Sequence, residues 1–101
     1  MRIKVSVSGT TKANEFEVDA NAGTKFVVKH TLGEIKFKVA DIKGNYAIIQ
    51  TNEPMCKSDG LHVRLSDRFK RFDWDMNLPL YVATPTMDYG VIVGIELISE
   101  A

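Results

Sequence analysis

The stretch that decides the fold class is EIKFKVADIKGNYAIIQ, residues 34–50. In its first half apolar residues alternate with charged ones, so every second side chain of an extended chain faces the same side. Residues 43–45, Lys-Gly-Asn, tolerate positive φ and predict a tight turn into a second strand, residues 46–50. The pattern is typical of two antiparallel strands with one apolar face.

Similar short segments, most of them alternating, recur along the whole chain, and polar turn residues separate them. The segments expected to be strands are residues 2–8, 14–19, 25–30, 34–42, 46–50, 61–65, 78–84 and 91–99. We therefore expect an all-β fold of about seven to eight short, mainly antiparallel strands, arranged as a β-sandwich or a small barrel. With 101 residues the chain has room for one core and one domain, residues 1–101.

Two segments do not follow the simple alternation. Residues 51–60 hold Pro54 and few apolar side chains, which predicts the longest loop. Residues 66–77 fit both a helical and a strand period, and we expect at most one short helical turn near residues 66–71 before a strand. The final segment, residues 91–99, has apolar residues on both faces, which predicts a central strand buried on both sides. Gly94 within it predicts a bulge or the close approach of another backbone.

Charge and cysteine content narrow the functional classes. Thirteen basic and thirteen acidic residues cancel, so an anionic partner must be met by a local patch rather than by a global field. The first residues lack the apolar run of a secretory signal, and no later run is long enough to cross a membrane. The single cysteine, Cys56, cannot form an internal disulfide. We expect a cytoplasmic protein without membrane contact.

One segment, residues 62–76, concentrates arginine and aromatic side chains and includes the only tryptophan. Arginine and tryptophan dominate protein interfaces, and methionine and tyrosine in the predicted loop 85–90 are typical of adaptable contact surfaces. The alternative is that these aromatic rings belong to the core. The residues expected to bind a protein partner are Arg68, Arg71, Phe72, Trp74, Met87 and Tyr89.

The same segment also supports a second interpretation. Basic residues interleaved with aromatic rings suit single-stranded nucleic acid, because cations meet phosphates while rings stack on bases. Acidic residues within the segment offset much of its positive charge, which weakens this interpretation. The residues expected to contact nucleic acid are Lys36, Lys38, Arg64, Arg68, Lys70 and Arg71.

The sequence predicts no catalytic residue, no metal ion and no cofactor. Residues 73–77, DWDMN, begin like a calcium loop, but Leu78 stands where that loop requires glycine and Thr84 stands where it requires glutamate. Cys56 and His62 are close in sequence, yet no residue is evident to orient them for nucleophilic catalysis.

We therefore expect a small intracellular protein-interaction module, such as an adaptor, an inhibitor or immunity-type protein, or an accessory subunit. The module is expected to act by binding rather than catalysis, as a monomer or weak homodimer. The alternative is a small β-barrel that binds single-stranded nucleic acid.

Overall fold

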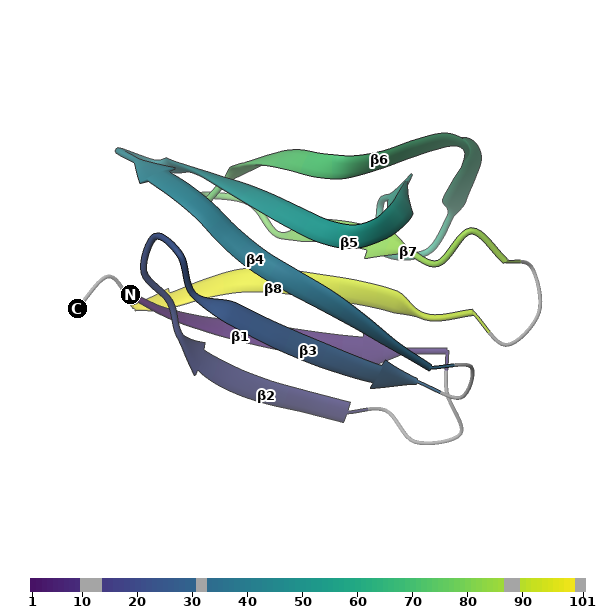
Figure 1. Cartoon of the computed structure of the whole chain (residues 1–101), viewed down its shortest axis with the longest axis horizontal. Coiled ribbons are helices and arrows are strands. Elements are labelled where there is room, and N and C mark those ends of the chain that lie inside the picture. The colour runs from purple at the N-terminus through teal and green to yellow at the C-terminus, as the bar shows by residue number, and fades with distance from the viewer. Residues whose placement is uncertain (10–13, 31–32, 87–89, 100–101) are drawn as a thin grey trace.

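The computed structural model describes residues 1–9, 14–30, 33–86 and 90–99, which form eight antiparallel strands and no helix (Figure 1). This confirms the expected all-β fold. The strands are β1 (Arg2–Ser8), β2 (Asn14–Asp19), β3 (Lys25–His30), β4 (Gly33–Lys43), β5 (Tyr46–Ser58), β6 (Val63–Asp75), β7 (Leu80–Ala83) and β8 (Ile92–Ser99).

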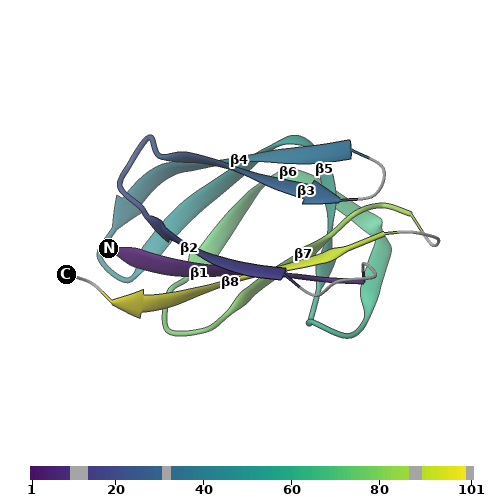
Figure 2. The same ribbon diagram turned by 90° about the horizontal axis from the view of Figure 1, so that it is seen from below.

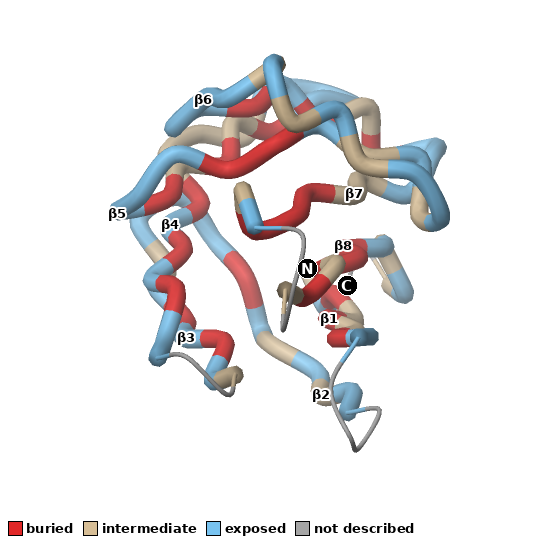
Figure 3. The backbone as a smooth tube through the Cα atoms, turned by 90° about the vertical axis from the view of Figure 1, so that its right-hand side faces the viewer, coloured by how far each residue is buried: buried red, intermediate tan, exposed pale blue. Residues whose placement is uncertain are grey.

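The strands form one strongly curved sheet in the order β2-β1-β8-β7-β5-β4-β3, and β6 pairs with β5 off this path. The sheet curls into a nearly closed barrel, so of the two architectures expected the barrel is the better description. Figure 2 shows β3 and β4 lying across from β1, β2 and β8. Figure 3 shows β2 and β3, the two ends of the sheet, at its open side. The open side is bridged by aromatic side chains, since the rings of Phe16 and Phe26 meet edge to face with centroids 6.4 Å apart.

Strand β5 is longer than predicted because it turns a corner of the barrel. Its first half pairs with β4 on one edge and β6 on the other, and its second half pairs with β6 and β7. Between the halves the register with β6 shifts between Gln50 and Met55, and the Thr51 hydroxyl donates to the Glu53 carbonyl at 2.7 Å. A bulge accommodates Pro54, which has no N–H for a ladder. The predicted long loop at residues 51–60 is therefore wrong.

No helical turn forms near residues 66–71, where we expected at most one. Residues 63–75 form the continuous strand β6, whose backbone groups pair with β5. The strand period of Phe72, Trp74 and Met76 carries these side chains into the core, whereas Phe69, on the helical spacing, is 44% exposed. Pairing of residues 63–75 with β5 therefore decided between the helical and the strand period of this segment.

The core follows the predicted alternation. Its largest fully buried side chains are Trp74, Phe37, Ile3, Ile35, Ile49, Met55 and Ile95. The rings of Phe26 and Phe37 stack with centroids 5.1 Å apart, which joins β3 to β4 inside the barrel. Each fully buried aliphatic or aromatic side chain stabilises the fold by about 1.5–3 kcal/mol relative to exposure.

Strand β8 lies between β1 and β7, which confirms the predicted central position. Gly94 is also closely approached, since a Cβ there would lie 2.8 Å from the Ser6 hydroxyl and 3.0 Å from the Tyr81 ring. The prediction that β8 is buried on both faces fails at its end, where Ile98 is 47% exposed.

Candidate nucleic-acid interface

The structure removes two residues from the predicted protein-binding site. Phe72 and Trp74 are 5% and 1% exposed, because both point from β6 into the barrel. The indole N–H of Trp74 is also satisfied internally, donating to the Leu78 carbonyl at 2.7 Å. Their assignment to a contact surface is therefore wrong, and both are core residues. Of the remaining four residues, Arg68 and Arg71 are exposed, whereas Met87 and Tyr89 lie outside the described residues.

The residues predicted to contact nucleic acid fall into two groups. Lys36 and Lys38 on β4 and Arg71 on β6 share the outer face of the barrel wall formed by β3, β4, β5 and β6. Arg64 and Arg68 lie on the first half of β6, beyond the bulge of β5, where each has an internal contact. The Arg64 guanidinium is 3.9 Å from the Asp67 carboxylate, and the Arg68 Nε donates to the Leu65 carbonyl at 2.8 Å. Lys70 is exposed opposite the bulge, between the two register segments.

A row of directly opposed residues crosses this wall. Lys25 on β3 pairs with Lys38 on β4, Lys38 with Gln50 on β5, and Gln50 with Arg71 on β6. Directly opposed residues of antiparallel strands share a face, so these side chains stand side by side. Lys36 lies on the same face two residues from Lys38. We call Lys25, Lys36, Lys38 and Arg71 the basic stripe; Lys25 entered neither predicted site.

The charges of the basic stripe have no acidic partner within the described part of the chain. Lys25 and Lys38 are like charges in directly opposed positions, an arrangement that destabilises a sheet. The other wall of the barrel is built differently. There Arg2 binds the Glu17 and Asp19 carboxylates at 2.8 and 3.0 Å, which raises the pKa of Arg2 above its ordinary value.

Lys4 on that wall likewise lies 3.5 Å from Glu96. Arg2 and Lys4 on one wall are therefore paired, whereas on the other wall Lys43 lies 3.8 Å from Asp41 and the four cations of the basic stripe have no acidic partner among the described residues. Unpaired cations on an exposed face form a local positive field, although the net charge of the chain is zero.

A pocket lies within the basic stripe, and a row with acidic side chains lies next to it. A pocket of about 370 Å³ opens among Lys25, Phe26, Val27, Lys36, Phe37, Lys38, Gln50, Thr51 and Asn52. The next row along the same wall opposes Asp41 to Ile48 and Ile48 to Asp73, so acidic side chains border the stripe on that side. The positive field of the basic stripe is therefore bounded on that side by Asp41 and Asp73, of which Asp41 lies 3.8 Å from the Lys43 ammonium.

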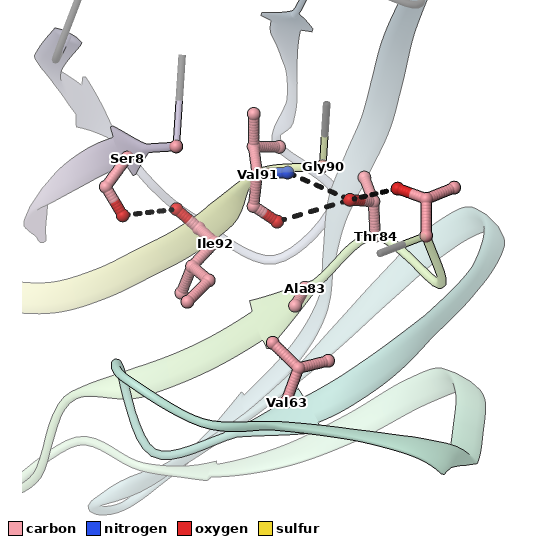
Figure 4. Close-up of a pocket in the computed structure, with 9 residues that line it drawn as sticks. Ser8, Val63, Ala83, Thr84, Gly90, Val91 and Ile92 are labelled. Atoms are coloured by element: carbon pink, nitrogen blue, oxygen red, sulfur yellow. Dashed lines mark hydrogen bonds between the residues drawn. The ribbon is translucent and has the colours of Figure 1, made fainter. Parts of the chain in front are cut away.

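A second pocket, of about 300 Å³, lies at the base of the predicted contact loop 85–90 (Figure 4). Its polar groups bind one another. The Val91 N–H donates to the Thr84 hydroxyl at 2.9 Å, and the Ser8 hydroxyl donates to the Ile92 carbonyl at 3.5 Å. The Thr84 N–H donates to the Val91 carbonyl at 3.0 Å, which joins the two ends of the loop. These contacts give the pocket a structural role.

The residues considered for catalysis lie apart. Cys56 is fully buried with its sulfur 3.8 Å from the Leu65 carbonyl, whereas His62 is exposed and its Nδ1 lies 3.1 Å from the Asp59 carboxylate. Backbone N–H bonds from His62 and Leu61 hold the pKa of Asp59 well below its ordinary value. Asp59 thus stabilises the turn between β5 and β6. Within the described residues, no three histidine, cysteine or carboxylate side chains are grouped to hold a metal ion.

Comparison with known proteins finds no matching family model, no similar curated sequence and no similar solved structure. A search of the described residues for helices long and apolar enough to cross a membrane finds none.

Proposed function

We propose that this protein acts by binding rather than by catalysis, and that the basic stripe holds single-stranded nucleic acid. The observation that carries the proposal is the unpaired row of Lys25, Lys38 and Arg71, with Lys36 beside it, in a chain whose charges cancel overall. Bound phosphates would relieve the repulsion between Lys25 and Lys38. The amide of Gln50 within the row adds hydrogen-bonding groups suited to bases.

This interface differs from the one predicted from the sequence. Of the three aromatic rings in residues 62–76, Phe72 and Trp74 are buried and Phe69 is 44% exposed, so affinity rests mainly on phosphate contacts and on the pocket beside them. Four phosphate contacts on a single strand predict a slope of log affinity against log salt of about −2.8. Between about 50 and 200 mM salt the affinity should then fall about 50-fold.

The test measures binding of a fluorescein-labelled twelve-nucleotide single strand by anisotropy across that salt range. The variant Lys25→Ala/Lys38→Ala/Arg71→Ala should lose most of the affinity and most of the salt dependence. The matched control, Arg64→Ala/Arg68→Ala/Lys70→Ala, removes the same number of charges outside the stripe and should bind like the wild type. Equal loss in both variants, or no binding by the wild type at low salt, would contradict the proposal.

A protein-interaction module remains the second candidate, and an exposed aromatic side chain favours it. Phe69 is 44% exposed, the Lys57 ammonium lies 5.0 Å from its ring centroid, and Arg71 and Leu80 line the same pocket of about 400 Å³. Retention of a stoichiometric protein after nuclease treatment, lost in a folded Arg68→Ala/Phe69→Ala variant, would favour this function over nucleic-acid binding.

A cytoplasmic location and a monomeric or weakly dimeric state belong to the same proposal. Cys56 is a buried free thiol, which suits a reducing compartment. The exposed charges Glu15 and Glu17 on β2, and Lys25 and Lys29 on β3, disfavour pairing of these edge strands with another copy. Sedimentation of the purified protein at increasing concentration tests the oligomeric state.

A further inference from the structure

The pocket beside the basic stripe has a chemistry of its own. The side chains of Phe26, Phe37 and Thr51 are buried in the barrel, so these residues contribute the floor of the pocket through their backbone. Its rim consists of the outward side chains of Lys25, Val27, Lys36, Lys38, Gln50 and Asn52. At about 370 Å³ it lies within the size range of small-ligand sites.

Asn52 is fixed in one orientation by the backbone of β4. The Lys36 N–H donates to the Asn52 Oδ1 at 2.8 Å. Because a backbone N–H is always a donor, the side-chain atom that faces it must be the oxygen. The Nδ2 group of Asn52 is therefore left with its two hydrogens for another partner.

The other polar groups of the rim are also mainly donors. The ammonium groups of Lys36 and Lys38 donate only, and Gln50, which is directly opposed to Lys38 and Arg71, carries an amide with both a donor and an acceptor. Asparagine recognises adenine with its oxygen and nitrogen together, whereas here the oxygen faces the Lys36 N–H and keeps one lone pair for a further contact. The exposed Val27 adds an apolar contact for the ring of a ligand.

From this geometry we infer that the pocket is a base-recognition site for keto bases, namely guanine, uracil or thymine, whose carbonyl oxygens accept from Asn52 and the lysines. Cytosine at C4 and adenine at C6 carry an amino group where the keto bases carry a carbonyl oxygen, so a donor placed at that position disfavours them. The inference rests on the proposed function, because the basic stripe holds the phosphates that flank the recognised base. Asn52 and Gln50 are then the specificity-determining residues.

The test compares twelve-nucleotide oligouridylate and oligocytidylate, whose bases differ at C4 by a carbonyl or an amino group. The wild type should bind oligouridylate about 10-fold more tightly, a ratio within the range that one well-placed base contact contributes. Asn52→Asp keeps an oxygen for the Lys36 N–H but replaces the donor Nδ2 with an acceptor. This variant should bind both strands more weakly and reverse the preference toward oligocytidylate.

The outcomes separate the two proposals. Equal affinity for both strands with the expected salt dependence would overturn the base-recognition site and leave the proposed function standing. A preference for uridine that persists unchanged in Asn52→Asp would also overturn the inference, since Asn52 would then not read the base. Failure of the wild type to bind either strand at low salt would overturn the proposed function and the inference with it.

Discussion

Reversing the charge of Lys38 should make the protein more stable and less able to bind nucleic acid. Lys38 is directly opposite Lys25 on the exposed face of β3 and β4, and neither ammonium has an acidic partner among the described residues. Lys38→Glu turns this repulsive pair into an attractive one at the same positions. If the Lys25–Lys38 pair destabilises the fold but binds phosphates, Lys38→Glu must raise the stability of the protein and lower its affinity for nucleic acid.

The expected magnitudes follow from the register. A directly opposed pair of opposite charges contributes about 0.2–1 kcal/mol, and like charges cost a similar amount, so we expect a gain of about 1 kcal/mol. For a domain of this size that corresponds to a rise in Tm of about 4–8 °C. The charge of the basic stripe falls from four to two, so the slope of log affinity against log salt should change from about −2.8 to about −1.4.

Lys4 provides the matched control, because its opposed residues are acidic, whereas Lys38 is opposed to a lysine. Lys4 is opposed to Glu17 on β2 and to Glu96 on β8, and its ammonium lies 3.5 Å from the Glu96 carboxylate. Lys4→Glu makes the same change in net charge but places three carboxylates side by side. It should therefore lower Tm and leave oligonucleotide affinity at the stripe nearly unchanged.

Thermal unfolding followed by circular dichroism gives Tm for both variants, and anisotropy titrations give their affinities. A lower Tm for Lys38→Glu would contradict this prediction, because the Lys25–Lys38 repulsion would then not destabilise the fold. Equal weakening of binding by Lys4→Glu and Lys38→Glu would also contradict it, because the affinity would then depend on net charge rather than on the basic stripe.

Three further predictions concern the scaffold. Gly9→Ala should lower the free energy of unfolding in urea more than Gly23→Ala. Both glycines have φ near +95°, so each substitution should cost about 1 kcal/mol or more, but only at Gly9 would a Cβ meet backbone, 2.6 Å from the Gly90 carbonyl oxygen. Equal losses in the two variants would contradict this prediction. Trp74→Phe should lower the free energy of unfolding by about 1–3 kcal/mol, through a cavity and a lost indole hydrogen bond, with oligonucleotide affinity unchanged. Asp59, whose pKa is depressed by folding, contributes stability that is fully present above the unfolded pKa of about 3.9 and is lost as pH falls from there. In Asp59→Asn the free energy of unfolding should thus fall less steeply as the pH is lowered below about 4. The same fall in the variant and the wild type would show that the turn does not depend on this carboxylate.

Much of the fold could be predicted from local patterns. The ranges 2–8, 14–19 and 25–30 coincide with β1, β2 and β3, and the turn at Gly44 has the predicted positive φ of +56°. Alternation and turn chemistry are properties of a few neighbouring residues, so they are visible before the chain folds. The bulge of β5 could not be predicted in this way, because it depends on the pairing of β5 with three other strands, β4, β6 and β7.

The candidate site was only partly predictable. Lys36 and Lys38 were identified because they alternate with apolar residues and must face solvent. Lys25 was missed, although its place in the predicted strand 25–30 and a tight turn to the next strand would have set it opposite Lys38. Phe72 and Trp74 were wrongly predicted to lie at the surface because residues 66–77 fit both a helical and a strand period, which left open which side chains turn inward.

The all-β class, most of the strand limits and the alternation that selects the core can be predicted from the chain before it folds, because they depend on local backbone preference and on hydrophobic periodicity. Which strands lie side by side becomes known only from the folded barrel. That pairing brings Lys25, Lys38 and Arg71, which are up to 46 residues apart, into one row. Register between distant strands arises from packing the whole barrel, and so the charge pattern of its surface emerges only when the chain is folded.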